Sequence, residues 1–218
     1  MDTIEVATGA KPTGAVIWMH GLGADGHDFE PIVPEIVQKN ERALRFVFPN
    51  APTRPVTING GYVMRAWYDI IGLDRKSSED EKGIRASDAL VRSLIKRENE
   101  RGIPTERIAL AGFSQGGAMA LFTGTRYPEK LAGIMALSCY LLLGTKLEAE
   151  KSAANQSTPI FMAHGRMDNV VHPQLGEESR QLLEKSGYEV EWHAYPMAHA
   201  VVPEEIGHIA AWLRRVLP

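Results

Sequence analysis

The sequence predicts an α/β protein with a mainly parallel central sheet and helices on both faces. Two observations support this prediction. Short apolar runs of strand length alternate along the 218 residues with longer segments of helical period. In addition, the apolar run at residues 107–111 leads into the turn Gly112-Phe113-Ser114-Gln115-Gly116, which is followed by helix-compatible residues up to Pro128. A strand, a sharp turn and a helix in this order are typical of parallel sheets.

The individual elements follow from the two hydrophobic periods. The helix through residues 84–95 is expected to begin at a capping box formed by Ser78 and Glu81. Strands are predicted at residues 3–7, 15–19, 44–48, 107–111, 131–138, 159–163 and 188–195. Helices are predicted at about residues 29–37, 84–95, 116–127, 175–185 and 203–216.

One stretch, at about residues 49–80, shows no clean period although it contains prolines, glycines and aromatic residues. A connection of this length inside a compact domain is usually functional. We therefore expect a lid or binding loop, with apolar residues that form one wall of a pocket.

Composition favours a single domain over residues 1–218. Hydrophobic residues make up 44% of the chain, enough for a sizeable core. A formal net charge of −3 and scattered basic residues argue against nucleic acid as a partner. The acidic start and the lack of a long apolar run predict no signal peptide and no stable membrane insertion, so we expect a cytoplasmic protein. The single Cys139 excludes an internal disulfide.

The turn around Ser114 has the Gly-x-Ser-x-Gly pattern of a nucleophile elbow. Such a turn forces the serine into a cramped backbone conformation and leaves no room for side chains at Gly112 and Gly116. It also brings the Gln115 backbone N–H to the start of a helix, where anions are favoured. We therefore predict that Ser114 is a nucleophile and that the Gln115 amide is one donor of an oxyanion hole.

The acid and the base follow by elimination, because in α/β-hydrolase sheets they come after the serine in the order acid, then histidine. Asp168 is the only aspartate after Ser114, and it lies just past a predicted strand. Of the seven histidines, His193 and His208 fall on polar faces of a strand and a helix, whereas His199 lies in the loop between them. The prediction is Asp168 as the orienting acid and His199 as the base.

The second oxyanion donor is expected in a loop after an early strand. The segment His20-Gly21-Leu22-Gly23 follows the apolar run at residues 15–19, and its glycines permit close backbone approach. The sequence therefore favours the Leu22 N–H as the donor and a supporting position for His20.

Taken together, the chain resembles the carboxylesterase and acyl-protein thioesterase group of small α/β-hydrolases. The resemblance implies the same catalytic residues and an acyl pocket lined by Ile70, Leu73, Tyr140 and Val170. Two departures are Ala198, where relatives often have Gly or Met, and Tyr140, where the eukaryotic thioesterases tend to have Trp. The shared motifs are His20-Gly21-Leu22-Gly23, Pro49-x-Ala51-Pro52, Trp67-Tyr68-Asp69, Gly112-Phe113-Ser114-Gln115-Gly116-Gly117, His164-Gly165-x-x-Asp168 and His199.

The expected activity is hydrolysis of carboxylic esters and acyl thioesters through an acyl-enzyme, in a monomer or weak homodimer. This chemistry requires neither a metal nor an organic cofactor, and the histidines lack the His-x-x-x-His spacing of zinc hydrolases. Three alternatives remain: acyl-protein thioesterase activity as the main role, a small serine peptidase, and a non-catalytic ligand receptor on the same fold.

Overall fold

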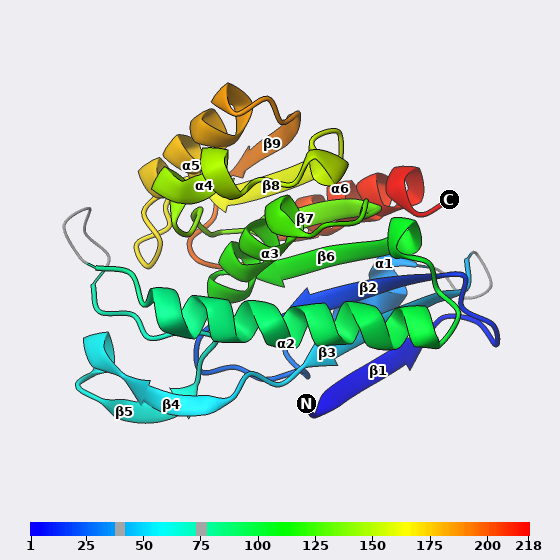
Figure 1. Cartoon of the computed structure of the whole chain (residues 1–218), viewed down its shortest axis with the longest axis horizontal. Coiled ribbons are helices and arrows are strands. Elements are labelled where there is room, and N and C mark those ends of the chain that lie inside the picture. Colours follow the sequence, from blue (N-terminus) through cyan, green and yellow to red (C-terminus); the bar gives the residue numbers. More distant parts are fainter. Residues whose placement is uncertain (38–41, 73–77) are drawn as a thin grey trace.

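A computed structural model describes residues 1–37, 42–72 and 78–218 of the chain. The strands of its central sheet are β1 (Thr3–Ala7), β2 (Gly14–Met19), β3 (Leu44–Pro49), β6 (Ile108–Phe113), β7 (Gly133–Leu137), β8 (Ile160–Gly165) and β9 (Val190–Tyr195). They form a seven-stranded sheet in the order β1-β3-β2-β6-β7-β8-β9 (Figure 1). β1 is antiparallel to β3, and every other neighbouring pair is parallel. The predicted fold class is confirmed.

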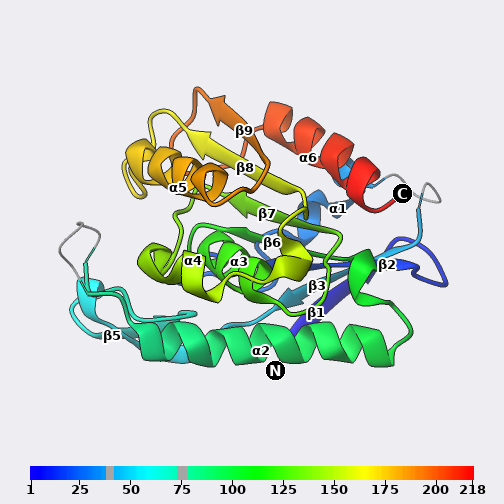
Figure 2. The ribbon, with the colours of Figure 1, turned by 45° about the horizontal axis from the view of Figure 1, so that its top comes forward.

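Helices cover both faces of this sheet (Figures 1 and 2). They are α1 (Val33–Ile36), α2 (Glu81–Glu100), α3 (Gln115–Arg126), α4 (Leu147–Glu150), α5 (Pro173–Lys185) and α6 (Pro203–Val216). The helices α2, α3, α4 and α5 bury apolar side chains in one core, whereas α1 and α6 bury theirs in a second core on the opposite face.

The central strand β2 explains why its sequence is apolar without alternation. Ala15, Ile17 and Met19 enter the core under α2 and α3, while Val16 and Trp18 enter the core under α1 and α6. All five side chains are buried, because a central parallel strand is covered on both faces.

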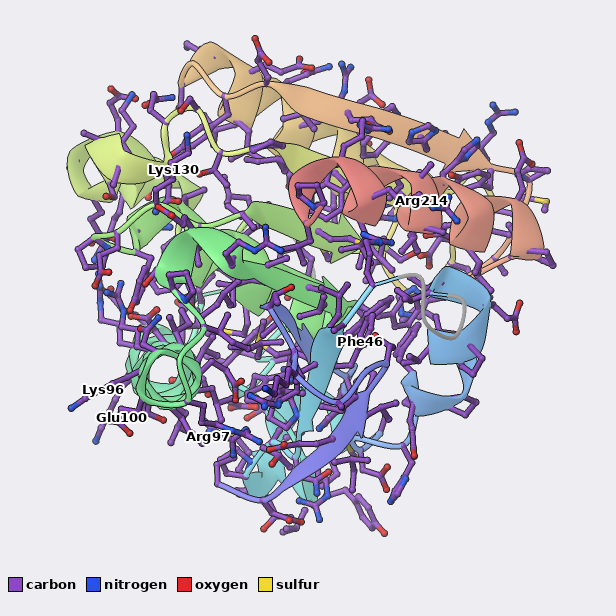
Figure 3. All side chains as sticks on the ribbon, turned by 90° about the vertical axis from the view of Figure 1, so that its right-hand side faces the viewer. Phe46, Lys96, Arg97, Glu100, Lys130 and Arg214 are labelled. Carbon is purple, nitrogen blue, oxygen red and sulfur yellow. The ribbon has the colours of Figure 1, made fainter. Side chains whose placement is uncertain are left out.

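The long helix α2 lies across one face with a polar side toward solvent. Lys96 and Glu100 extend outward from it, whereas Phe46 of β3 lies inside the molecule (Figure 3). The predicted capping box of Ser78 and Glu81 is wrong: the N-cap is Asp80, whose carboxylate accepts the backbone N–H of Gly83 at 2.9 Å.

The helix predicted at residues 29–37 is shorter than expected. A 3₁₀ turn, Glu30–Ile32, precedes the short α1, Val33–Ile36. Pro34 lacks the backbone N–H that a regular helix over this segment would bond to the Glu30 carbonyl, so the segment is divided into two short turns.

The segment at residues 49–80 contains a hairpin that the sequence did not predict. Its strands are β4 (Thr53–Val56) and β5 (Tyr62–Arg65), which pair antiparallel. They are joined by a 3₁₀ turn, Thr57–Asn59, and by two glycines in the left-handed region. Within the described ranges, no helix is both long and apolar enough to cross a bilayer.

Candidate active site

The predicted site residues lie on loops at the carboxyl ends of four parallel strands of the central sheet. Leu22 follows β2, Ser114 follows β6, Asp168 follows β8 and His199 follows β9. Parallel strands bring these loops to one edge of the sheet, where ligands bind in α/β folds.

The turn after β6 has the geometry of a nucleophile elbow. Ser114 adopts φ 54° and ψ −121°, a conformation that is costly for a residue with a side chain. A Cβ at Gly112 would lie 2.2 Å from the backbone carbon of Gly116, and a Cβ at Gly116 would lie 2.2 Å from the carbonyl oxygen of Met19. Both positions therefore require glycine, as the sequence predicted.

Two backbone amides beside Ser114 are free to bind an anion. In the part of the chain that the structure describes, the N–H groups of Leu22 and Gln115 have no backbone acceptor. Both residues line the same cavity as Ser114. The Leu22 loop is fixed in place by Gly23, which has φ 77° and donates its N–H to the Arg65 carbonyl at 2.9 Å.

The side chain of His20 supports this loop through two hydrogen bonds. Its Nδ1–H donates to the Gly21 carbonyl at 2.7 Å, and its Nε2 accepts the Ala51 N–H at 3.0 Å. The indole N–H of Trp67 donates to the His20 carbonyl at 3.0 Å. Burial lowers the pKa of His20, which favours the neutral ring that these two bonds require.

Asp168 and His199 form a hydrogen-bonded pair. His199 Nδ1 donates to Asp168 Oδ2 at 2.7 Å. The other carboxylate oxygen accepts the backbone N–H groups of Val170 and Val171, each at 2.9 Å. The Asp168 side chain is fully buried, so these three bonds fix the orientation of its carboxylate.

The loops after β8 and β9 are in direct backbone contact, which holds this pair together. The Met167 N–H donates to the Met197 carbonyl at 3.0 Å. A Cβ at Gly165 would lie 2.3 Å from the carbonyl oxygen of Ala198, so only glycine allows the two loops to approach this closely.

In the described structure, Ser114 and His199 make no hydrogen bond to each other. The ring of Phe113, the residue before Ser114, packs 4.7 Å from the ring of His199. Bonds between a nucleophile and its base are often loose without substrate.

A cavity of about 160 Å³ opens beside Ser114. Of the predicted acyl-pocket residues, Ile70, Tyr140 and Val170 lie in its wall, and Leu73 lies outside the described residues. Its full lining is Leu22, Ile58, Asn59, Tyr68, Ile70, Ser114, Gln115, Tyr140, Val170 and Val171. A larger open groove, of about 630 Å³, lies at the amino ends of β7, β8 and β9, away from these side chains.

Several wall residues and one positioning contact were not predicted from the sequence. Ile58, Tyr68 and Val171 belong to the wall, and the motif around Trp67 was the available signal for Tyr68. The Gln115 side chain accepts the Trp67 N–H at 2.7 Å and donates to the Tyr68 carbonyl at 2.8 Å. It thereby joins the elbow to the segment that forms the cavity wall.

His164 lies near Asp168 but is occupied by another contact. Its Nε2–H donates to the Val171 carbonyl at 2.9 Å and lies 3.5 Å from Asp168 Oδ2. Burial lowers the pKa of His164, so the neutral ring is favoured. This position suits a role in holding the loop after β8.

The remaining candidate bases lie away from the cavity. His193 Nε2 contacts Glu191 at 3.0 Å, and His208 Nδ1 contacts the Tyr195 hydroxyl at 2.7 Å. The two imidazole rings stack on each other, with their centroids 4.5 Å apart. Across the described ranges, no three His, Cys, Asp or Glu side chains are grouped so that they could bind a metal ion.

Fold and site together define a hydrolase of the α/β-hydrolase class. The chain belongs to the phospholipase/carboxylesterase family, whose model matches residues 1–217. It is 44% identical to acyl-protein thioesterase 1 of Neurospora crassa, over 96% of this chain and 89% of that protein. It is 37% identical to acyl-protein thioesterase 1 of Saccharomyces cerevisiae, over 100% of this chain and 99% of that protein.

Solved structures agree with this assignment. Zea mays acyl-protein thioesterase 2 superposes with a TM-score of 0.88 at 28% identity, covering 100% of this chain and 99% of that chain. Arabidopsis thaliana SOBER1 superposes with a TM-score of 0.88 at 30% identity, covering 94% of this chain and 99% of that chain. The protein is a serine hydrolase of the carboxylesterase and thioesterase type, as the sequence predicted.

Proposed function

We propose that the protein cleaves carboxylic esters and acyl thioesters through an acyl-enzyme on Ser114, with His199 as base and Asp168 as its orienting acid. The observation that supports these roles most strongly is the hydrogen bond between buried Asp168 and His199, located at the same strand ends as the strained elbow. A nucleophile, a base and an orienting acid are the parts that acyl transfer requires.

The first half of the reaction forms the acyl-enzyme. Nε2 of His199 removes the proton from Ser114 Oγ, and the oxygen attacks the carbonyl carbon of the substrate. The oxyanion that develops accepts hydrogen bonds from the Leu22 and Gln115 amides. His199 then gives its proton to the leaving alcohol or thiol as the bond to the acyl carbon breaks.

In the second half, a water molecule replaces the alcohol or thiol. His199 takes a proton from this water, whose oxygen attacks the acyl carbon, and the proton returns to Ser114 Oγ when the acid is released. Throughout, Asp168 holds Nδ1 of His199 protonated and stabilises the imidazolium that forms. The three hydrogen bonds to its buried carboxylate keep it in the required orientation.

Removal of acyl groups from proteins is the second candidate for the main role, in the same active site. It is supported by the curated relatives named acyl-protein thioesterase 1 and by an apolar rim around the cavity, where Ile58 is 42% exposed and Val170 52% exposed. We propose a monomeric or weakly dimeric cytoplasmic protein. Comparing turnover of an S-acylated peptide with that of a matched p-nitrophenyl ester separates the two roles.

The roles are tested by replacing the reacting side chains. We expect Ser114→Ala and His199→Ala each to lower kcat for a p-nitrophenyl ester by roughly a millionfold, because members of a triad act as a unit. His193→Ala and His208→Ala are the matched controls and are expected to keep wild-type turnover to within a few fold. An active His199→Ala variant beside an inactive His193→Ala variant would reject the assignment of the base.

A further inference from the structure

The cavity beside Ser114 has exposed, mainly apolar side chains at its opening, together with Asn59, and buried tyrosines at its inner end. Ile58 and Val170, at the opening, are 42% and 52% exposed. Tyr68 is only 2% exposed, and Tyr140 is packed against the core. The inner end of the acyl pocket is therefore formed by two tyrosines.

The hydroxyls of Tyr68 and Tyr140 are hydrogen-bonded to each other, which leaves one of the two O–H hydrogens without an acceptor in the described structure. Their oxygens are 3.2 Å apart, so one O–H donates to the other. Among the described residues, no further acceptor is bonded to either hydroxyl. The nearby carboxylate of Glu79 instead accepts the Leu143 N–H at 2.8 Å. Burial raises the pKa of both Tyr68 and Tyr140, which keeps both hydroxyls protonated at neutral pH.

We propose that this hydroxyl pair donates a hydrogen bond to an oxygen within the acyl chain, so that the enzyme prefers short oxoacyl groups over unsubstituted chains of equal length. The inference rests on the proposed function, because it places the acyl group of the Ser114 ester in this cavity. An unsubstituted chain would cover the second O–H without accepting its hydrogen, which is costly for a buried donor.

The size of the cavity restricts the chain. Its volume of about 160 Å³ is well below the ~300–1,000 Å³ of pockets for drug-sized ligands, so a short acyl group fits. A ketone oxygen is a suitable partner because it only accepts hydrogen bonds. The carbonyl group that carries it takes the place of one methylene group with little change in the shape of the chain.

The experiment compares two matched pairs of p-nitrophenyl esters, 4-oxopentanoyl with pentanoyl and 5-oxohexanoyl with hexanoyl. Each kcat/KM is divided by the rate constant for hydroxide-catalysed hydrolysis, which removes intrinsic reactivity. We expect the wild-type ratio of oxo to unsubstituted ester to reach at least about tenfold for one pair, the factor that corresponds to ~1.4 kcal/mol. In the double variant Tyr68→Phe with Tyr140→Phe, this ratio is expected to fall close to one.

Each single variant retains one hydroxyl that can still donate, so its ratio is expected to lie between those of the wild type and the double variant. Tyr188→Phe is the matched control, since this buried tyrosine donates to the Thr125 carbonyl outside the cavity, and its ratio should equal that of the wild type. Ratios near one or below in the wild type would overturn the inference even if the double variant did not fold. A preference that survives in the double variant would also overturn it.

These failures differ from failure of the proposed function. If the wild type cleaved acetyl and pentanoyl esters without any oxo preference, the serine esterase assignment would stand and only the hydroxyl-pair inference would fall. If the wild type cleaved neither these esters nor an S-acylated peptide, both would be rejected.

Discussion

At the residue scale, Asp168 shows which properties of a site side chain can be predicted. Its proposed role as the acid followed by elimination, because no other aspartate comes after Ser114. Its three hydrogen bonds could not be predicted, since two of them come from the backbone of Val170 and Val171 and depend on the turn after β8. A sequence pattern indicates which chemistry a residue offers, whereas the contacts that orient it arise only after folding.

Glu205 is a buried carboxyl group outside the proposed chemistry, and it leads to a prediction about stability and pH. Burial raises the pKa of Glu205 from 4.5 to about 8, and the nearby Val202 amide only partly opposes this shift. Between these two values, the folded protein holds a proton that the unfolded chain releases. The free energy of unfolding should therefore decrease as pH rises from about 4.5 to about 8.

The substitution Glu205→Gln removes this titration while keeping a similar shape. Relative to the Gln variant, the wild type is expected to lose on the order of 1 kcal/mol per pH unit across the window, measured by urea unfolding at several pH values. Glu204→Gln, at the exposed neighbouring position, is the control and should follow the wild type. Parallel pH profiles for Glu205→Gln and the wild type would contradict the prediction.

At the element scale, the sequence predicted the elbow but missed the hairpin. The elbow could be predicted because there is no room for a side chain at Gly112 and Gly116, so both positions require glycine. The strands β4 and β5 have no comparable signal in their sequence. Most of their side chains are exposed or half-buried, so neither strand shows an alternation of apolar and polar residues.

Gly165 is expected to matter for catalysis although it carries no reactive group. Its substitution by alanine would bring Cβ within 2.3 Å of the Ala198 carbonyl oxygen and 2.4 Å of the Met197 carbonyl oxygen. Because these are backbone atoms, the loop that carries His199 must move. We expect Gly165→Ala to lower kcat roughly a hundredfold, the effect of about 1 Å of misplacement.

The matched control is Gly207→Ala in α6, where an added Cβ meets no atom within 4 Å. We expect this variant to keep the wild-type kcat, where kcat is calculated per active site counted with an active-site titrant. Wild-type kcat for Gly165→Ala on the same basis would show that the close approach of the two loops does not position the base.

At the scale of the whole molecule, the layers could be predicted but the strand order could not. Continuous apolar runs such as residues 15–19 indicate strands covered on both faces. The order in which strands pair is not encoded in any local period. The return of β3 to the far side of β2, between it and β1, is set by long-range contacts.

The two cores share every central strand, so we propose that the protein unfolds as a single unit. Trp67 lies in the core under α2 and α3, whereas Trp18 and Trp212 lie in the other. Replacing Trp67 or Trp18 by Phe changes how strongly each core contributes to the tryptophan fluorescence. In each variant, we expect fluorescence and far-UV circular dichroism to give the same denaturant midpoint. Separate midpoints within one variant would show that the cores unfold independently.

The turn that carries Asp168 has a consequence for how new substrate ranges can evolve. Val170 and Val171 donate their backbone N–H groups to Asp168, the proposed acid, and also line the cavity, so we expect a change of backbone there to alter substrate fit and catalysis together. Ile58 and Ile70 line the cavity from a segment that holds no proposed triad residue. We therefore expect insertions to be best tolerated at the hairpin turn, Thr57–Asn59, because Arg65 at the end of β5 holds the Leu22 loop and must stay in place.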